Sequence, residues 1–180
     1  MTTATQNCAA LILAAGSGTR MKSALPKVLH KLAAEPMIVH VARAASALNP
    51  ARMAAVVAPG MEAVRGALKH YPACKFAVQE KQQGTGHAVL QAREALMGFK
   101  GTVLILFGDT PLIMPEILTR MLDAAKSAQV VVLGARMSNP TGYGRLVLAG
   151  DGSLARIVEC RDATPLEKAL TLCNAGAMAV

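Results

Sequence analysis

Residues 8–27 read CAALILAAGSGTRMKSALPK, an apolar run that leads into two glycines and then into cations. A short apolar run ended by glycine predicts a strand that is buried on both faces in a parallel sheet. Glycines at positions 16 and 18 let backbone N–H groups approach an anion closely, and the basic side chains that follow add positive charge. The stretch therefore predicts a phosphate-binding loop. A surface turn with solvated cations fits the spacing equally well.

Further apolar runs alternate with segments of helical spacing along the chain. Strands are predicted at 8–14, 52–58, 74–78, 102–107 and 129–135, and helices at 37–48, 61–69, 87–97 and 115–127. This alternation is typical of a doubly wound α/β fold with a mostly parallel, Rossmann-like sheet. Beyond Asn139 the pattern changes to a β-hairpin at 145–149 and 154–160, a short helix at 164–169 and a last strand at 170–180. We expect one domain over the 180 residues, because no segment reads as a linker.

The composition argues against several classes of protein. A net charge of +8 favours anionic partners, but the basic residues are scattered and only three Phe and two Tyr accompany them, so no nucleic-acid partner is expected. The four cysteines lie far apart without a Cys-x-x-Cys pair, and the four histidines show no metal-ligand spacing. Neither a membrane-spanning apolar stretch nor a basic region before the first apolar run is present, so a cytoplasmic protein without a membrane partner is expected.

The glycine pair excludes two common nucleotide sites. No third glycine follows at the spacing of a dinucleotide-binding turn, and no Gly-Lys-Ser/Thr closes a P-loop. The position of the pair favours a ligand site over a plain turn, because ligands of open α/β sheets bind beyond the carboxyl ends of the strands and this loop follows the first strand.

Three further groups of residues are candidates for binding. Asp109 ends the strand predicted at 102–107, where one carboxylate suits a Mg²⁺ ion held largely by water and phosphate oxygens, although a turn or cap role before Pro111 fits as well. A polar loop can pair with a base edge through Gln79, Gln82, Gly84 and Thr85. Gly144, Glu159 and Asn174 match sugar hydroxyls and an N-acetyl amide, although surface Glu and Asn commonly bind nothing.

Combined, these motifs match one family. The matching segments are Leu13-Ala-Ala-Gly-x-Gly-Thr-Arg-Met, Leu25-Pro-Lys27-Val-Leu-His, Gln79-x-x-Gln82-x-Gly84-Thr85-Gly-His-Ala, Gly108-Asp109-x-Pro-Leu, Pro140-Thr-Gly-Tyr-Gly144-Arg and Ile157-Val-Glu159. From about Ala9 to Val180 the chain resembles the uridylyltransferase domain of bacterial bifunctional N-acetylglucosamine-1-phosphate uridyltransferase/glucosamine-1-phosphate acetyltransferases. The resemblance implies a nucleotide-diphospho-sugar transferase fold with a small sugar-binding hairpin. It also implies Mg²⁺-dependent transfer of UMP from UTP to N-acetylglucosamine 1-phosphate, in cell-wall precursor synthesis.

The resemblance also implies a role for each matched residue. Catalysis falls to Arg20 and Lys27, and Mg²⁺ binding to Asp109. The nucleotide is held by Leu13, Ala14, Ala15, Gly16, Gly18, Lys27, Gln79, Gln82, Gly84, Thr85, Phe107, Gly108 and Asp109, and the sugar by Gly144, Glu159 and Asn174.

The chain departs from the family pattern at two kinds of place. Phe107 stands where the family often has Tyr, and Ala175 where Thr is usual. The family's domain continues past the position of Val180 and supplies a second metal ligand. It is followed by a left-handed β-helix that carries acetyl transfer and the trimer contacts. An incomplete, monomeric nucleotidyltransferase domain is therefore expected. The alternatives are a non-catalytic fragment that binds a nucleotide or sugar nucleotide, and a transferase for another sugar phosphate or base.

Overall fold

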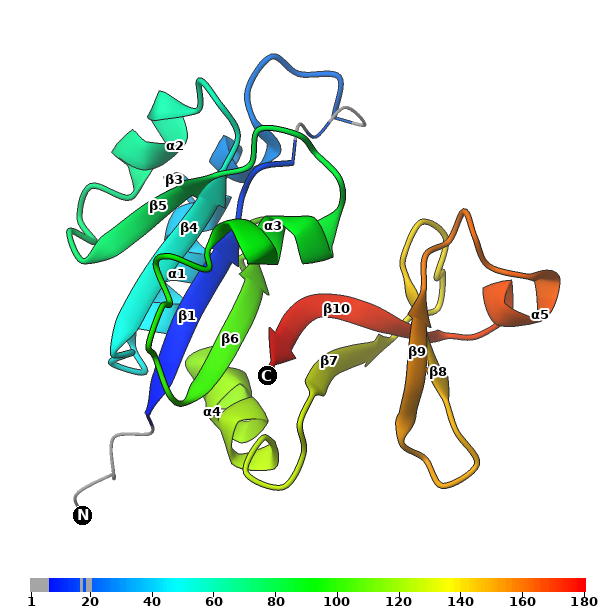
Figure 1. The fold of residues 1–180 in the computed structure, drawn as a ribbon. Helices are drawn as coiled ribbons and strands as arrows, with labels where there is room; N and C mark the ends of the chain where they lie inside the picture. Colours follow the sequence, from blue (N-terminus) through cyan, green and yellow to red (C-terminus); the bar gives the residue numbers. More distant parts are fainter. Residues whose placement is uncertain (1–6, 17, 19–20) are drawn as a thin grey trace. The chain divides into compact units, whose positions relative to one another are not determined.

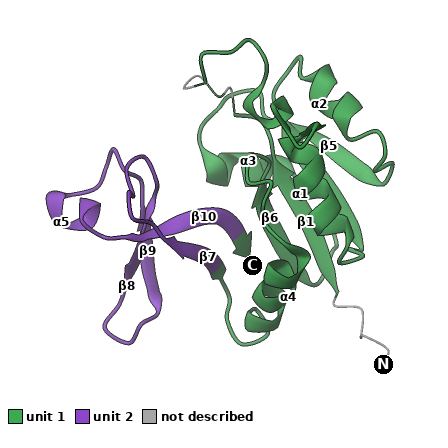
Figure 2. Cartoon of the chain, turned by 180° about the vertical axis from the view of Figure 1, so that it is seen from behind, with its two compact units in different colours: residues 1–131, 178–180 green, residues 132–177 purple. Residues whose placement is uncertain are grey.

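The computed structural model describes residues 7–16, 18 and 21–180 (Figure 1). The chain divides into two compact units, residues 1–131 with 178–180 and residues 132–177 (Figure 2). Arg20, expected to be catalytic, lies outside the described residues. None of the helices formed by the described residues is long and apolar enough to span a bilayer.

The first unit is built on a parallel sheet. Its strands lie in the order β5 (Cys74–Val78), β4 (Arg52–Val57), β1 (Cys8–Leu13) and β6 (Thr102–Phe107). All three pairings between these strands are parallel. Val180 lies beside β6 and exchanges two main-chain hydrogen bonds with Val103, of 2.8 and 3.1 Å, which is the antiparallel pattern. The strands predicted in the first 107 residues are confirmed to within one residue at each end, and so is the mostly parallel sheet.

Helices cover both faces of this sheet. They are α1 (Met37–Ser46), α2 (Glu62–Ala67), α3 (Thr85–Gln91) and α4 (Pro115–Ala124), with a short 3₁₀ helix η2 at Lys27–Leu29. In Figure 1 α3 lies in front of the sheet and α1 behind it, and Figure 2 shows the reverse. Ala88 and Ala92 pack against Leu11, Val56 and Ile105 in one buried cluster, so small helical residues allow α3 to approach the strands closely.

Helix α3 is shorter than the sequence predicts. It ends at Gln91 instead of residue 97, and the chain continues in turns. The Arg52 guanidinium donates to the carbonyl oxygens of Ala95 and Met97, at 3.4 and 2.7 Å, so a side chain from β4 takes up carbonyls of the segment that was expected to be helical. The helix also begins earlier than predicted, because the N-cap is Gly84 with φ +96° and Thr85 is the first helical residue.

A small hairpin in the first unit has no counterpart in the sequence prediction. Strands β2 (Lys31–Leu32) and β3 (Glu35–Pro36) pair antiparallel. The two residues between them, Ala33 and Ala34, have φ of +47° and +68°. Positive φ at both central residues is typical of a two-residue hairpin turn, but such turns usually carry Gly, Asn or Asp. The Ala-Ala pair therefore gives no sequence signal for this turn.

The second unit is an antiparallel assembly with one short helix. Its elements are β7 (Val131–Arg136), β8 (Arg145–Leu148), β9 (Leu154–Val158), α5 (Pro165–Lys168) and β10 (Leu172–Ala179). The predicted β8–β9 hairpin, short helix and last strand are confirmed. Strand β7 forms near the predicted 129–135, but it pairs with β10 and extends no parallel sheet. The absence of a side chain at Gly134 allows Leu146 and Leu172 to pack against β7, since a Cβ there would lie 3.0 Å from a methyl group of Leu146 and 3.1 Å from one of Leu172.

Helix α5 begins with a reciprocal capping arrangement. The Thr164 hydroxyl accepts from the Glu167 N–H at 3.3 Å, while Glu167 Oε2 accepts from the Thr164 N–H at 2.8 Å. The other carboxylate oxygen accepts from Arg156 of β9 at 2.5 Å. These bonds lower the pKa of Glu167 to about 2, and the bond from the Thr164 backbone N–H makes the largest contribution.

Leu11 tests the importance of the central strand, because it is fully buried in the cluster shared by β1 and α3. We expect Leu11→Ala to lower the free energy of unfolding by roughly 2–5 kcal/mol, through lost transfer energy and the cavity left behind. Urea unfolding followed by circular dichroism measures this. Leu90→Ala is the matched control, since Leu90 is 67% exposed and should change stability by less than about 0.5 kcal/mol. Equal losses in the two variants would contradict the packing described.

Glu167 predicts a specific pH dependence of stability. Its pKa is lower in the folded chain than its ordinary 4.5, so the carboxylate stabilises the fold above about pH 4.5, and this contribution is lost as the pH falls toward about 2. We expect Glu167→Gln to be less stable than wild type at pH 7 and to lose less stability on acidification. Urea unfolding at pH values from 7 to 3 measures both. Parallel pH curves for the two proteins would contradict the capping role.

Candidate functional site

The first candidate site follows from where the chain changes direction across the parallel sheet. From β1 the chain crosses through α1 to β4 on one side, and it later returns through α3 to β6 on the other side. Leu13 and Phe107 are register partners at the carboxyl ends of β1 and β6. Ligands of open α/β sheets bind at such a switch point, between loops that diverge from neighbouring strands. The glycines predicted to bind phosphate follow the end of β1, and Asp109, predicted to bind the metal, follows the end of β6.

The loop after β1 carries Gly16 and Gly18 and is called the glycine loop below. Its start is held by the strands on either side of β1. The Ala14 N–H donates to Val56 of β4 at 2.8 Å, and the Gly108 N–H donates to the Leu13 carbonyl at 2.9 Å. Gly18 has φ +61°, and a Cβ there would lie 2.7 Å from the Cβ of Lys27. A glycine at position 18 is therefore required for the backbone of Lys27 to pass this close.

Lys27 and Asp109 form an ion pair beside the glycine loop. Lys27 Nζ lies 2.5 Å from Asp109 Oδ2, and the two side chains remain 35% and 26% exposed. Buried Val28 and Leu29 anchor η2, which begins at Lys27. The turn after β6 is closed by Thr110, whose hydroxyl donates to the Phe107 carbonyl at 2.7 Å. The Asp109 carboxylate thus faces a cation from another loop, and a neighbouring residue performs the turn role considered for it.

The two predicted glutamines join the loops of this site. Gln82 Nε2 donates to the Ala15 carbonyl at 2.7 Å, which ties the loop after β5 to the glycine loop. Gln79 is 4% exposed, and its Nε2 donates to the Gly84 carbonyl at 3.2 Å. The same Nε2 lies 3.0 Å from Nδ1 of His87. His87 was not predicted as a site residue, although its position eight residues after Gln79 and four before Gln91 is visible in the sequence.

The predicted sugar residues lie together in the second unit. The Asn174 N–H donates to the Gly144 carbonyl at 2.9 Å, and the side-chain Oδ1 of Asn174 accepts from the Gly176 N–H at 3.0 Å. A Cβ on Gly144 would lie 3.6 Å from Glu159 Oε1. The chain therefore places a backbone turn, a carboxylate and an amide next to one another.

Arg145 supports this cluster and was not predicted as a site residue. It is 2% exposed, and its guanidinium donates to the carbonyls of Tyr143 and Lys168. Its Nε has no hydrogen-bond partner among the described residues. An arginine at the start of an apolar strand is the sequence signal that could have identified it. Its bonds fix the peptide that precedes Gly144 to the end of α5.

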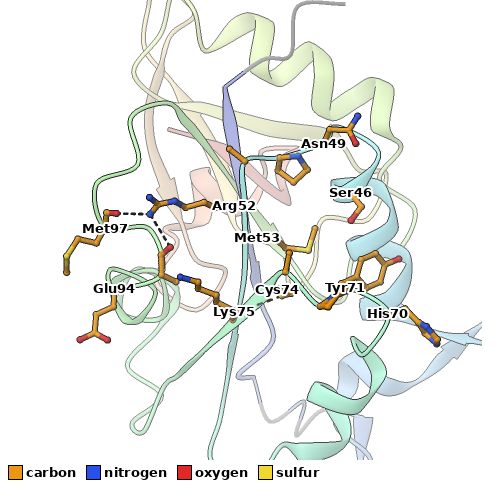
Figure 3. Close-up of a pocket in the computed structure, with 15 residues that line it drawn as sticks. Ser46, Asn49, Arg52, Met53, His70, Tyr71, Cys74, Lys75, Glu94 and Met97 are labelled. Atoms are coloured by element: carbon orange, nitrogen blue, oxygen red, sulfur yellow. Dashed lines mark hydrogen bonds between the residues drawn. The ribbon is translucent and has the colours of Figure 1, made fainter.

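A separate pocket of about 750 Å³ lies at the opposite, amino end of the first unit's sheet (Figure 3). Arg52 and Cys74, at the starts of β4 and β5, line it together with His70, Tyr71 and Glu94. It contains none of the predicted site residues, and burial raises the pKa of the Cys74 thiol to about 11, so this thiol is protonated and unreactive at neutral pH. The carboxyl edge is therefore the stronger candidate site, despite the size of this pocket.

The chain matches a known protein family and is similar to known proteins. A family model described as MobA-like NTP transferase domain matches residues 10–172. The "Bifunctional protein GlmU" of Rhodospirillum rubrum is 55% identical over 175 residues, and that of Ruegeria pomeroyi is 53% identical over 172 residues. The alignments cover 96% and 95% of this chain, but the chain spans only 38% of the length of each relative.

Solved structures share the fold at low sequence identity. A UDP-glucose pyrophosphorylase complexed with UDP-glucose superposes with a TM-score of 0.75 at 20% identity, covering 97% of this chain and 76% of that one. HddC from Yersinia pseudotuberculosis complexed with GMP-PN gives a TM-score of 0.73 at 17% identity, covering 96% and 76%. These likenesses confirm the predicted fold class.

Gly18 provides a test of the loop geometry that needs no ligand. We expect Gly18→Ala to lower the free energy of unfolding by at least about 1 kcal/mol, because its φ is positive and the added Cβ would clash with Lys27. Gly16→Ala is the control, since a Cβ at position 16 meets no atom within 4 Å and should cause no loss. Denaturant unfolding measures both variants. Equal stability of the two would contradict the close approach of Lys27.

Proposed function

Because the chain belongs to the MobA-like NTP transferase domain family, we propose that it transfers UMP from UTP to N-acetylglucosamine 1-phosphate, releasing pyrophosphate and forming UDP-N-acetylglucosamine. The observation that carries this proposal is the Lys27–Asp109 pair beside the glycine loop at the switch point of the sheet. The relatives named GlmU support the choice of reaction. Because this chain spans 38% of their length, no further activity of theirs is proposed for it.

The triphosphate is assigned to the glycine loop and its cations. Gly16 and Gly18 have no Cβ, so backbone N–H groups of this loop are proposed to approach the phosphates closely, whereas the Ala14 N–H is already used by the Val56 carbonyl. Lys27 supplies a positive charge at the same edge of the sheet. Arg20, which lies outside the described residues, is proposed to add a second charge on the outer phosphates. Neutralising the charge that builds up on the departing pyrophosphate lowers the barrier to its release.

Asp109 is proposed to hold Mg²⁺. Its carboxylate is partly exposed and lies against one cation, Lys27, so an oxygen ligand is available at the phosphate site. No group of three His, Cys, Asp or Glu side chains that could hold a metal occurs among the described residues. This fits an ion that retains water and takes its other ligands from phosphate oxygens, as Mg²⁺ does in nucleotide sites. The bound ion would supply charge neutralisation and alignment of the phosphates.

The base and the sugar are assigned to different units. Gln79, Gln82, Gly84 and Thr85 are proposed to read uracil, with Phe107 and Gly108 also near the nucleotide at the end of β6. In the second unit, Gly144, Glu159 and Asn174 are proposed to bind the sugar hydroxyls and the acetamido group. A carboxylate accepts from hydroxyls, whereas an amide both donates and accepts, so this set suits an N-acetylated sugar.

The proposed chemistry needs no covalent intermediate with the protein. A phosphate oxygen of the sugar phosphate forms a bond to the α-phosphorus of UTP, and the bond from that phosphorus to the β-phosphate bridging oxygen breaks. The electron pair leaves with pyrophosphate. The protein's residues contribute positioning and charge neutralisation, which are the main sources of catalysis in transfers at phosphorus.

We also propose a cytoplasmic role in the synthesis of cell-wall and lipopolysaccharide precursors.

The test is pyrophosphate release by the purified chain with UTP, Mg²⁺ and N-acetylglucosamine 1-phosphate. We expect Asp109→Asn to lower kcat/KM by about a hundredfold or more and to raise the Mg²⁺ concentration needed for half-maximal rate, because the neutral amide is a weaker metal ligand. Asp151→Asn is the matched control, since Asp151 is exposed in the β8–β9 turn, where it accepts from Ser153. It should leave both quantities unchanged.

Two outcomes would count against the proposal. Binding of UTP without pyrophosphate release would contradict transfer and leave a nucleotide-binding protein. Equal rates with dTTP, GTP or CTP would contradict the choice of uracil.

A further inference from the structure

His87 lies between two glutamine side chains. Its Nδ1 is 3.0 Å from Gln79 Nε2, and its Nε2 is 3.2 Å from Gln91 Nε2. Gln79 is 4% exposed at the end of β5, whereas His87 and Gln91 belong to α3 and are partly exposed. The imidazole therefore connects the buried start of the loop after β5 with the helix that follows that loop.

The carbonyl of Gly84 fixes the orientation of the Gln79 amide. A carbonyl oxygen only accepts, so the amide atom 3.2 Å from it must be the nitrogen. That nitrogen has two hydrogens, and the second one points to His87 Nδ1. Since an amide nitrogen only donates, this contact requires Nδ1 to accept, which assigns the ring hydrogen to Nε2.

A neutral imidazole has one acceptor nitrogen, so the two glutamines cannot both donate to it. Gln79 has the shorter contact and is buried, where an unsatisfied amide hydrogen is costly. Gln91 Nε2 also donates to the His87 carbonyl, at 3.3 Å, but Gln91 is partly exposed, so its amide can give up both contacts for hydrogen bonds to solvent. The acceptor of His87 therefore goes to Gln79.

The oxygen of the Gln79 amide is consequently left for another donor. Oε1 accepts no hydrogen bond from the described residues, and it is not among their fully buried polar atoms. An acceptor at this position complements N3 of uracil, which carries a hydrogen, and opposes N3 of cytosine, which carries a lone pair.

We infer that His87 is a positioning residue for base selection: its Nδ1, with the Gly84 carbonyl, holds Gln79 Oε1 toward the base, so that a uracil nucleotide is preferred over a cytosine nucleotide. The inference rests on the proposed function, because it takes Gln79 as a residue that reads the base. Removing the Nδ1 acceptor leaves the Gly84 carbonyl as the one acceptor, among the described residues, that holds the amide nitrogen. Turning the amide over, so that its nitrogen faces the base and suits cytosine, then costs less free energy.

The experiment compares dissociation constants for UTP and CTP by calorimetry, which requires no turnover. Wild type should prefer UTP, and His87→Leu should reduce the preference by about tenfold, the factor given by one hydrogen bond of ordinary strength. His87→Asn restores an acceptor near Nδ1 and should recover most of the preference. Gln91→Leu removes the other neighbour of the same ring and should keep it. Circular dichroism checks that each variant folds. If His87→Leu does not fold, His87→Ala replaces it, because alanine is the strongest helix former.

The outcomes separate the two proposals. A wild-type preference for UTP that survives in His87→Leu, or that His87→Asn loses as completely as His87→Leu, overturns the role of His87 and leaves the proposed function standing. Equal affinity of wild type for UTP and CTP overturns both.

Discussion

The parallel pairing of β1 with β4 on one side and β6 on the other is the constraint on which the first unit depends. Strand β1 is buried along nearly its whole length, so every backbone group in it must find a partner in a neighbouring strand. Its two neighbours are reached by connections on opposite faces of the sheet. The loops that follow β1 and β6 therefore diverge, and the glycine loop and Asp109 meet at the point of divergence.

Much of the first unit could be predicted from the sequence because burial on both faces leaves a simple pattern. Mainly apolar runs give the strand limits to within a residue, and β6 is followed directly by Gly108-Asp109. Features that depend on contacts between distant residues could not be predicted. Beyond the end of α3, Arg52 from β4 bonds the Ala95 and Met97 carbonyls, and the β2–β3 turn has two alanines at positive φ. The pairing of β7 with β10 joins segments that are far apart in the chain, and no local pattern shows it.

The candidate site could be predicted as a set of residues but not as a set of interactions. Motif spacing identified Lys27, Asp109 and the glutamines, yet it could not show that Lys27 faces Asp109 or that Gln82 bonds to Ala15. These partners are far apart in the chain, and their loops become neighbours only through the order of the strands. His87 and Arg145 were missed for a different reason. Their partners Gln79 and Tyr143 are close in the sequence, but spacing alone does not show that these side chains form hydrogen bonds.

Gln79 and Arg145 are the buried polar side chains among the described residues, and neither is explained by stability alone. Burying an amide or a guanidinium costs free energy that hydrogen bonds to carbonyls only partly return, and apolar residues of similar size are commonly as stable or more so. Each of the two bonds a carbonyl in a glycine-containing loop, of Gly84 in one unit and of Tyr143, before Gly144, in the other. Such loops have many accessible backbone conformations. A buried donor selects one conformation of each, which accounts for polar groups in otherwise apolar surroundings beside both proposed recognition loops.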